Sequence, residues 1–110
     1  MPSVDIRAER DDDRARIMPA GPFDLAHALA VGRAVESAER SLDECRSVDV
    51  DLAHLDRIDG TGAVLLARFM ERLAAAGHRT SLVEDSNPEA ARLIALYRTS
   101  RTHGPAPTST

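Results

Sequence analysis

The sequence contains no lysine and no tryptophan, and the absence of lysine excludes two kinds of site. All fourteen basic residues are arginines. A phosphate-binding P-loop needs a lysine at the β- and γ-phosphates, and Schiff-base catalysis needs a lysine amine. The net charge is −4, and the arginines are scattered among acidic residues instead of forming a basic stripe. We therefore expect no binding to nucleic acid.

Cysteines and long apolar runs are also scarce. Cys45 is the only cysteine, so no internal disulfide can form, and the charged N-terminus lacks the apolar run of a signal peptide. The longest apolar run, Ala63 to Ala67, is far shorter than the ~20 residues of a membrane span. We expect a cytoplasmic chain that meets a membrane only indirectly, through a partner or a fused permease.

The 110 residues suit one domain with one modest core. Apolar and polar residues alternate over 4–9 and 14–18, which predicts a hairpin whose second strand ends at the Pro-Ala-Gly-Pro of 19–22. Further strands are predicted at 48–52 and 80–83. Because the alternation leaves each strand one polar face, the helices should lie mainly on one side of the sheet.

Helical spacing of apolar residues predicts helices over 25–44, over 61–76 and from Pro88 onward. Asp24 should cap the first helix and Gly77 should end the second. The segment from 48 to 83 then forms a strand, helix, strand unit with parallel strands. The last helix should bury Leu93, Ile94, Leu96 and Tyr97. Residues 1–98 are expected to form the domain, and residues 99–110 a disordered tail or linker.

The segment from Asp51 to Gly62 is the one concentrated candidate for a functional site. It joins the end of a strand to the beginning of a helix, where free backbone N–H groups favour anions. Asp59 and Thr61 are candidate caps, so the alternative is that they cap the helix while Gly60 and Gly62 permit a tight turn. No pattern for zinc, a dinucleotide or a nucleophilic serine is complete. We expect no enzyme, no cofactor and no metal.

The helix predicted over 61–76 carries two apolar stripes. Leu66, Met70 and Leu73 recur at core spacing, whereas Leu65 and Phe69 lie about 100° around the helix from them. These two residues either widen the buried face or form an exposed contact patch beside Arg68 and Arg72.

The order of elements and two motifs resemble a STAS domain, the module shared by sulfate transporters and anti-sigma factor antagonists. The motifs are Gly21-Pro-Phe-Asp24 and the segment from Asp51 to Leu66, and the resemblance covers about residues 3–98. It implies an α/β fold with a single mixed sheet of four to five strands and helices mainly on one face. It also implies a non-catalytic interaction module.

The resemblance points to two kinds of partner. In anti-sigma factor antagonists, a serine or threonine directly after the loop aspartate is phosphorylated, but here Gly60 follows Asp59 and the nearest hydroxyl is that of Thr61. Asp-Gly-Thr-Gly-Ala followed by two leucines resembles instead the STAS modules of lipid-transport ABC transporters. We expect docking on an ABC-transporter ATPase subunit through Asp59, Gly60, Thr61, Gly62, Leu65, Phe69 and Arg72. The alternative is an anti-sigma factor antagonist that an anti-sigma factor kinase phosphorylates at Thr61.

Overall fold

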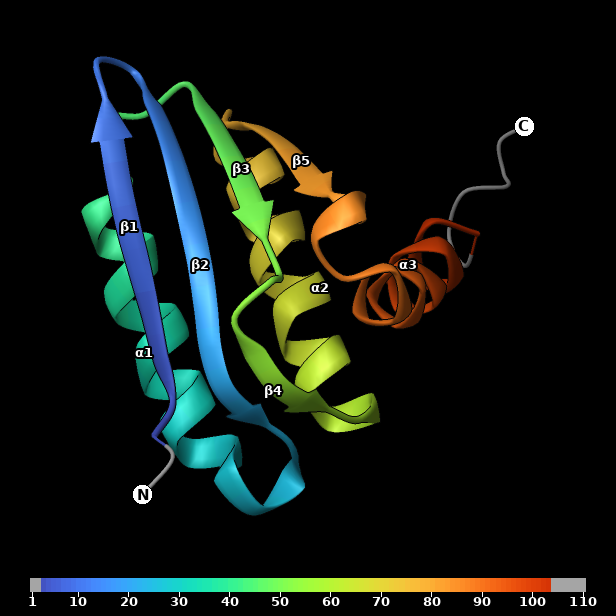
Figure 1. Ribbon diagram of the computed structural model, residues 1–110. Coiled ribbons are helices and arrows are strands. Elements are labelled where there is room, and N and C mark those ends of the chain that lie inside the picture. The colour runs from blue at the N-terminus through green and yellow to red at the C-terminus, as the bar shows by residue number, and fades with distance from the viewer. Residues whose placement is uncertain (1–2, 104–110) are drawn as a thin grey trace.

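The computed structural model describes residues 3–103 of the chain and contains one sheet and three long helices (Figure 1). Two short 3₁₀ turns, η1 and η2, precede the first and last helices. The elements in chain order are β1 (Asp5–Asp11), β2 (Arg14–Phe23), η1 (Leu25–His27), α1 (Ala28–Ser41), β3 (Ser47–Asp51), β4 (Leu55–Ile58), α2 (Gly60–Ala75), β5 (Arg79–Val83), η2 (Glu84–Ser86) and α3 (Pro88–His103).

The sheet is mixed, with the strand order β1, β2, β3, β5. β1 and β2 form the predicted antiparallel hairpin, and β3 pairs parallel with both β2 and β5. The predicted strand, helix, strand unit is therefore β3, α2 and β5. The α/β class and the mixed sheet are confirmed.

β2 is longer than predicted, because the Pro-Ala-Gly-Pro segment does not end it. β2 pairs with β3 as far as Ile17 and with β4 from Gly21 onward. Pro19 lies between these two pairings, where the strand has only β1 as a partner. A proline is tolerated there, since a strand flanked on one side can leave out one hydrogen-bond donor. β4 itself was not predicted, because Leu55 to Ile58 lacks the alternation of the other strands.

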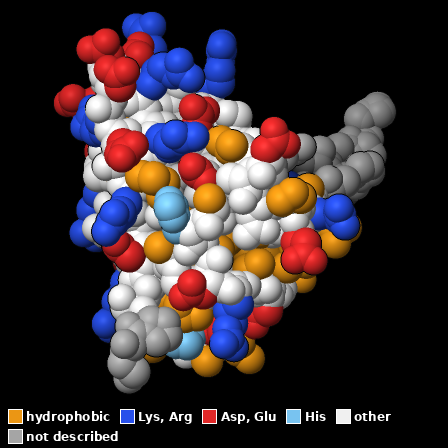
Figure 2. Space-filling view, viewed as in Figure 1, with side chains coloured by type: hydrophobic (Ala, Val, Ile, Leu, Met, Phe, Trp, Pro, Cys, Tyr) orange, Lys and Arg blue, Asp and Glu red, His pale blue; other side chains and the backbone are white. Residues whose placement is uncertain are grey.

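All three helices lie on one side of the sheet, as predicted. α1 and α2 lie behind it in Figure 1, and α3 packs beside α2. Ala15, Ile17, Val48 and Val50 point toward the helices and are buried. The opposite face carries arginines and acidic residues side by side (Figure 2), and Arg14 and Arg16 form ion pairs there with Asp49 and Asp51.

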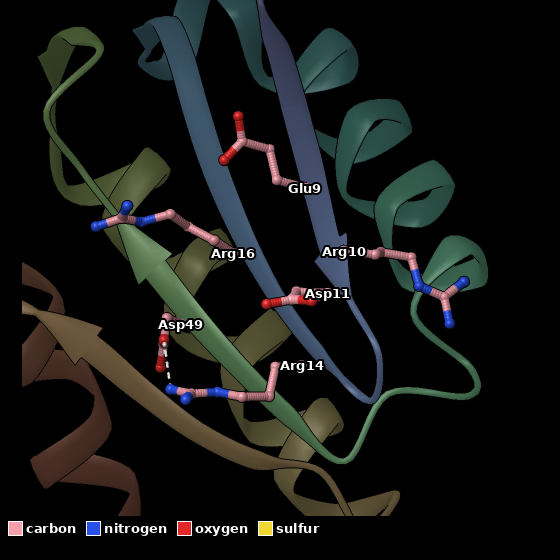
Figure 3. A pocket seen from close by; sticks show the side chains of 7 residues that line it. Glu9, Arg10, Asp11, Arg14, Arg16 and Asp49 are labelled. Carbon is pink, nitrogen blue, oxygen red and sulfur yellow. Dashed lines mark ion pairs between the residues drawn. The ribbon is translucent and has the colours of Figure 1, made fainter.

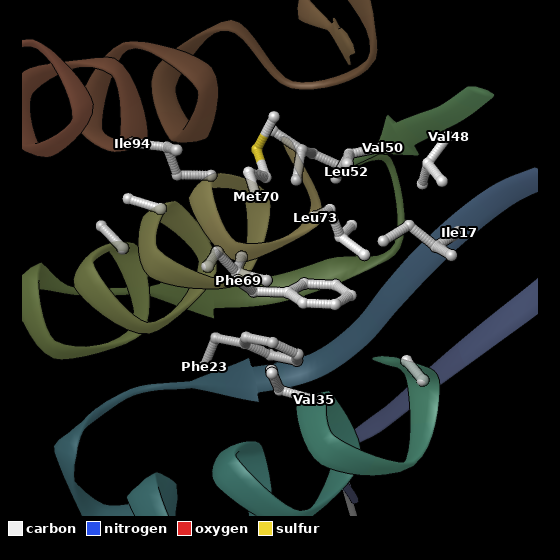
Figure 4. Close-up of a cluster of buried hydrophobic side chains, with 14 of the residues drawn as sticks. Ile17, Phe23, Val35, Val48, Val50, Leu52, Phe69, Met70, Leu73 and Ile94 are labelled. Carbon is white, nitrogen blue, oxygen red and sulfur yellow. The ribbon is translucent and has the colours of Figure 1, made fainter. Parts of the chain in front are cut away.

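The core fills the space between the sheet and the helices (Figure 4). Leu66, Met70 and Leu73 are buried, which confirms the main stripe of α2. Phe69 is also fully buried, so its prediction as an exposed contact residue is wrong. α1 covers that flank of α2, and Figure 4 shows Phe69 pointing toward the ring of Phe23.

α3 differs from its prediction at two places. Ile94 is buried and Tyr97 is partly buried, but Leu96 remains 60% exposed because it turns away from α2. The helix also continues to His103, beyond the boundary predicted at residue 98. The rest of the predicted tail, residues 104–110, lies outside the described residues.

Replacing Phe69 with alanine should test its place in the core. We expect Phe69→Ala to lower the free energy of unfolding by about 3–5 kcal/mol, because it leaves a cavity beside Phe23. Leu96→Ala, on the exposed side of α3, is the control and should change stability by less than about 0.5 kcal/mol. Urea denaturation measures the free energy of unfolding of both variants. An equally small loss of stability in both would contradict the burial of Phe69.

Candidate protein-docking site

The candidate site lies at the end of the sheet where β2 and β4 stop and where α1 and α2 both begin. The backbone N–H of Asp59 donates to the Phe23 carbonyl over 3.2 Å, and the N–H of Gly21 donates to the His54 carbonyl over 3.3 Å. These bonds fix the loop before α2 to the end of β2. The sequence predicted this segment as the site, but not its attachment to β2.

Asp59 caps α2 and also holds the segment that leads into α1. Its Oδ1 accepts from the Gly62 N–H, and its Oδ2 accepts from the Leu25 N–H, each over 3.0 Å. These hydrogen bonds, that of Gly62 first, lower the pKa of the Asp59 carboxyl below its ordinary value of 3.8. Both oxygens are thus engaged within the fold. Asp59 therefore shapes the loop by linking it to the segment that leads into α1.

A second carboxylate, that of Asp24, supports the beginning of η1. Its Oδ1 accepts from both the backbone N–H and the Nδ1 of His27, over 3.2 and 2.6 Å. Arg57 on β4 lies 3.9 Å from the other oxygen, but its side chain is 73% exposed, so that this ion pair contributes little. Asp24 thus caps the segment that begins at Leu25, as predicted, but this segment is the 3₁₀ turn η1, and the N-cap of α1 itself is His27.

The two loop glycines are in close contact with neighbouring elements. A Cβ atom at Gly62 would lie 1.9 Å from the Phe23 carbonyl oxygen, which no side chain could accommodate. A Cβ atom at Gly60 would lie 2.7 Å from the hydroxyl oxygen of Tyr97 on α3. Gly62 is buried, whereas Gly60 and Thr61 are half-buried. The loop is therefore enclosed by β2 on one side and by α3 on the other.

Exposed leucines lie beside this loop. Leu25, whose N–H binds Asp59, is 69% exposed, and Leu29, one helical turn later, is 79% exposed. Neither leucine was predicted as part of the site, although Leu29 falls outside the buried stripe of α1. We call Leu25, Leu29, Thr61 and Leu65 the docking surface.

The predicted helix face of Leu65, Phe69 and Arg72 is only partly available to a partner. Leu65 is half-buried against the core, and Phe69 is inaccessible. Arg72 is exposed and donates from Nε to Glu39 on α1 over 3.2 Å, so it also links the two helices. Of the three residues, Leu65 lies closest along α2 to the loop, one turn after Thr61.

The charged face of the sheet contains hollows lined mainly by arginines and acidic residues. One of about 600 Å³ lies by the β1–β2 turn, at the other end of the sheet from the loop (Figure 3). Arg14 there lies 3.5 Å from Asp49, so the charges neutralise one another. Within residues 3–103, no group of three His, Cys, Asp or Glu side chains could hold a metal ion. No described helix is long and apolar enough to span a membrane.

Solved structures resemble the fold across most of its length. An anti-sigma factor antagonist from Mycobacterium paratuberculosis matches 88% of this chain and 82% of its own, with 19% identity and a TM-score of 0.63. The Bacillus cell fate determinant SpoIIAA, in its phosphorylated form, matches 86% of both chains, with 17% identity and a TM-score of 0.57. The chain has the STAS fold.

A third similar structure is much larger than this STAS domain. Mglu is 32% identical over 70% of the chain, with a TM-score of 0.56, but the match covers only 19% of Mglu. The chain thus spans about a fifth of that protein. Neither a protein-family model nor a curated protein matches the sequence.

Changing Asp59 to asparagine should test the double cap. An amide offers one oxygen, and its NH₂ group would face the second N–H donor, so Asp59→Asn should lower the free energy of unfolding by about 1–2 kcal/mol at pH 7. The lowered pKa adds a pH dependence. The stabilisation is fully present above the ordinary pKa of 3.8 and is lost as the pH falls through the lower folded value. In urea denaturation, the difference between the two proteins should shrink below about pH 4, and a difference that grows on acidification would contradict the double cap.

Proposed function

We propose that this STAS domain is a regulatory interaction module that binds a partner protein through the docking surface. The observation that carries the proposal is the pair of exposed leucines, Leu25 and Leu29, beside a loop that Asp59 holds rigid. Exposed apolar side chains on a preorganised backbone are typical of interface anchors, since little conformational entropy is lost on binding. The site offers shape and apolar area rather than reactive groups.

The first candidate partner is a kinase or an anti-sigma factor. The two similar antagonists have nearly the same length as this domain, and their match over most of both chains supports a regulator of the same kind. The fold alone does not choose between these two partners.

The second candidate is the ATPase subunit of a lipid-transport ABC transporter, bound at the cytoplasmic face of the inner membrane. The observation that favours it is the lack of a hydroxyl at Gly60, where a side chain would collide with Tyr97. The Asp-Gly-Thr-Gly-Ala motif resembles the STAS modules of these transporters. The domain would act there either as a free subunit or as the N-terminal part of a permease.

Capture of the partner from the source cell distinguishes these candidates. The immobilised full chain should retain one protein that Leu29→Glu binds about 10-fold or more weakly, since the charge would have to be buried at an apolar contact. Ser37→Glu, at an exposed position two turns further along α1, is the control and should bind like wild type. Mass spectrometry then identifies a kinase, an anti-sigma factor or a transporter ATPase. A retained protein that binds Leu29→Glu as well as wild type would contradict the docking surface.

Thr61 allows a separate test of phosphorylation. Its position one residue after Gly60 displaces its hydroxyl around the turn, so we expect it to be a poor kinase substrate. Thr61→Ala should weaken partner binding by about 1 kcal/mol or less, and Thr61→Glu should weaken it more because of its charge. Recovery of stoichiometric phosphate on Thr61 from cells would contradict this expectation and favour the antagonist function.

A further inference from the structure

β1 is an edge strand, and no other strand of the described residues 3–103 lies on its outer side. It pairs with β2 alone, and Figure 1 shows it at the left margin of the sheet with α1 behind it. All of its residues except Ile6 are exposed. An edge strand of this kind presents backbone N–H and C=O groups that can pair with a strand of another chain.

The turn after β1 determines which of these backbone groups point outward. Only two residues separate β1 from β2, and in such a hairpin the last residue of the first strand, here Asp11, is hydrogen-bonded to the second strand. Hydrogen-bonded and non-hydrogen-bonded pairs alternate along antiparallel strands, so the groups that point away from β2 are those of Ile6, Ala8 and Arg10. Pro19 agrees with this assignment, because it lies opposite Ile6 and has no N–H to donate.

The order of charges on β1 suits a second β1 that runs in the opposite direction. When the outward groups of both copies pair, Ala8 lies opposite Ala8, and on either side of it Arg7 lies opposite Glu9 of the other copy. Asp5 then lies opposite Asp11, which is a like-charged pair, but Asp5 is 3.9 Å from Arg7 in its own strand. The next register in either direction places Arg7 opposite Arg7, or Glu9 opposite Glu9. The charges therefore favour one register, with a second copy of this chain as the occupant.

The flank of α1 beside this edge is lined with small side chains. Glu39 of α1 accepts from Arg72 of α2, which identifies the side of α1 that faces α2. Helical spacing places four small residues on the opposite side, at the outer margin of the domain: Ala30, Ala34, Ser37 and Ser41. Pairing at β1 brings the α1 helices of two copies alongside one another, because α1 packs against β1. Small side chains allow the axes of two such helices to approach closely.

We propose that this chain forms a symmetric dimer in which two β1 strands pair antiparallel and join two sheets into one. Three features carry the proposal: the unpaired outer edge of β1, the self-complementary positions of Arg7 and Glu9, and the small side chains on the outer flank of α1. Charged side chains on an edge strand usually prevent pairing with unrelated strands, so this edge selects its own copy. The dimer uses none of the four residues of the docking surface and is independent of the proposed function.

Sedimentation equilibrium of the full chain tests the dimer. The weight-average mass should rise from 11.9 kDa toward twice that value as the protein concentration is raised to about 1 mM. Arg7→Glu places two carboxylates opposite one another, and Glu9→Arg places two guanidinium groups opposite one another. Each variant alone should dimerise about 10-fold more weakly than wild type. An equimolar mixture of the two variants should form a heterodimer, because every one of these pairs then has opposite charges.

Two further variants separate this interface from the rest of the molecule. Ala8→Pro removes the outward N–H at the centre of the interface and should make the chain monomeric, with little change in melting temperature because β2 does not use that N–H. Leu29→Glu, in the docking surface, is the control and should dimerise like wild type. The charge variants decide the question if Ala8→Pro does not fold.

Three results would overturn the proposal. The first is a wild-type chain that remains at 11.9 kDa up to about 1 mM. The second is a dimer that Arg7→Glu and Glu9→Arg both leave unchanged, since it would have to form elsewhere. The third is a mixture of these two variants that associates no better than either variant alone, which would exclude the antiparallel register.

Discussion

The carboxylate of Asp59 is the group on which the candidate site depends. α1 and α2 begin at the same end of the sheet, and each leaves backbone N–H groups without a partner in its first turn. One oxygen of Asp59 binds the N–H of Gly62 in α2, and the other binds the N–H of Leu25 ahead of α1. A single residue thus satisfies donors of both segments and sets the distance between them. The exposed leucines and Thr61 are positioned as a result.

The two ends of the sheet differ in what they offer a ligand. By the β1–β2 turn, arginines and acids pair across the open face, and these exposed pairs add little stability. At the loop end, Asp24 and Asp59 accept hydrogen bonds from the backbone, and Leu25 and Leu29 are exposed. α1 and α2 both begin at the loop end because they follow β2 and β4, which are parallel.

Much of the fold follows from alternation and capping signals in the sequence. Strands with one polar face indicate a sheet covered on one side, and Asp24, Asp59, Gly77 and Asn87 end or begin helices as such residues usually do. β4 was not predicted because it has only four residues and because its partner, the end of β2, lies far away in the sequence. The burial of Phe69 was not predicted because it depends on how closely α1 approaches α2. The apolar pattern of one helix gives no information on that distance. The contact between Tyr97 and Gly60 joins residues far apart in the chain and leaves no local signal.

Amide NMR over a pH titration tests the double cap most directly. If one carboxylate binds both donors, the amide protons of Leu25 and Gly62 should shift together on acidification, with one common midpoint below the ordinary 3.8 of an aspartate. The amide of Gly32, in the middle of α1, should not follow that midpoint. Separate midpoints for Leu25 and Gly62, or a common midpoint above 3.8, would contradict the claim that Asp59 holds the two segments together.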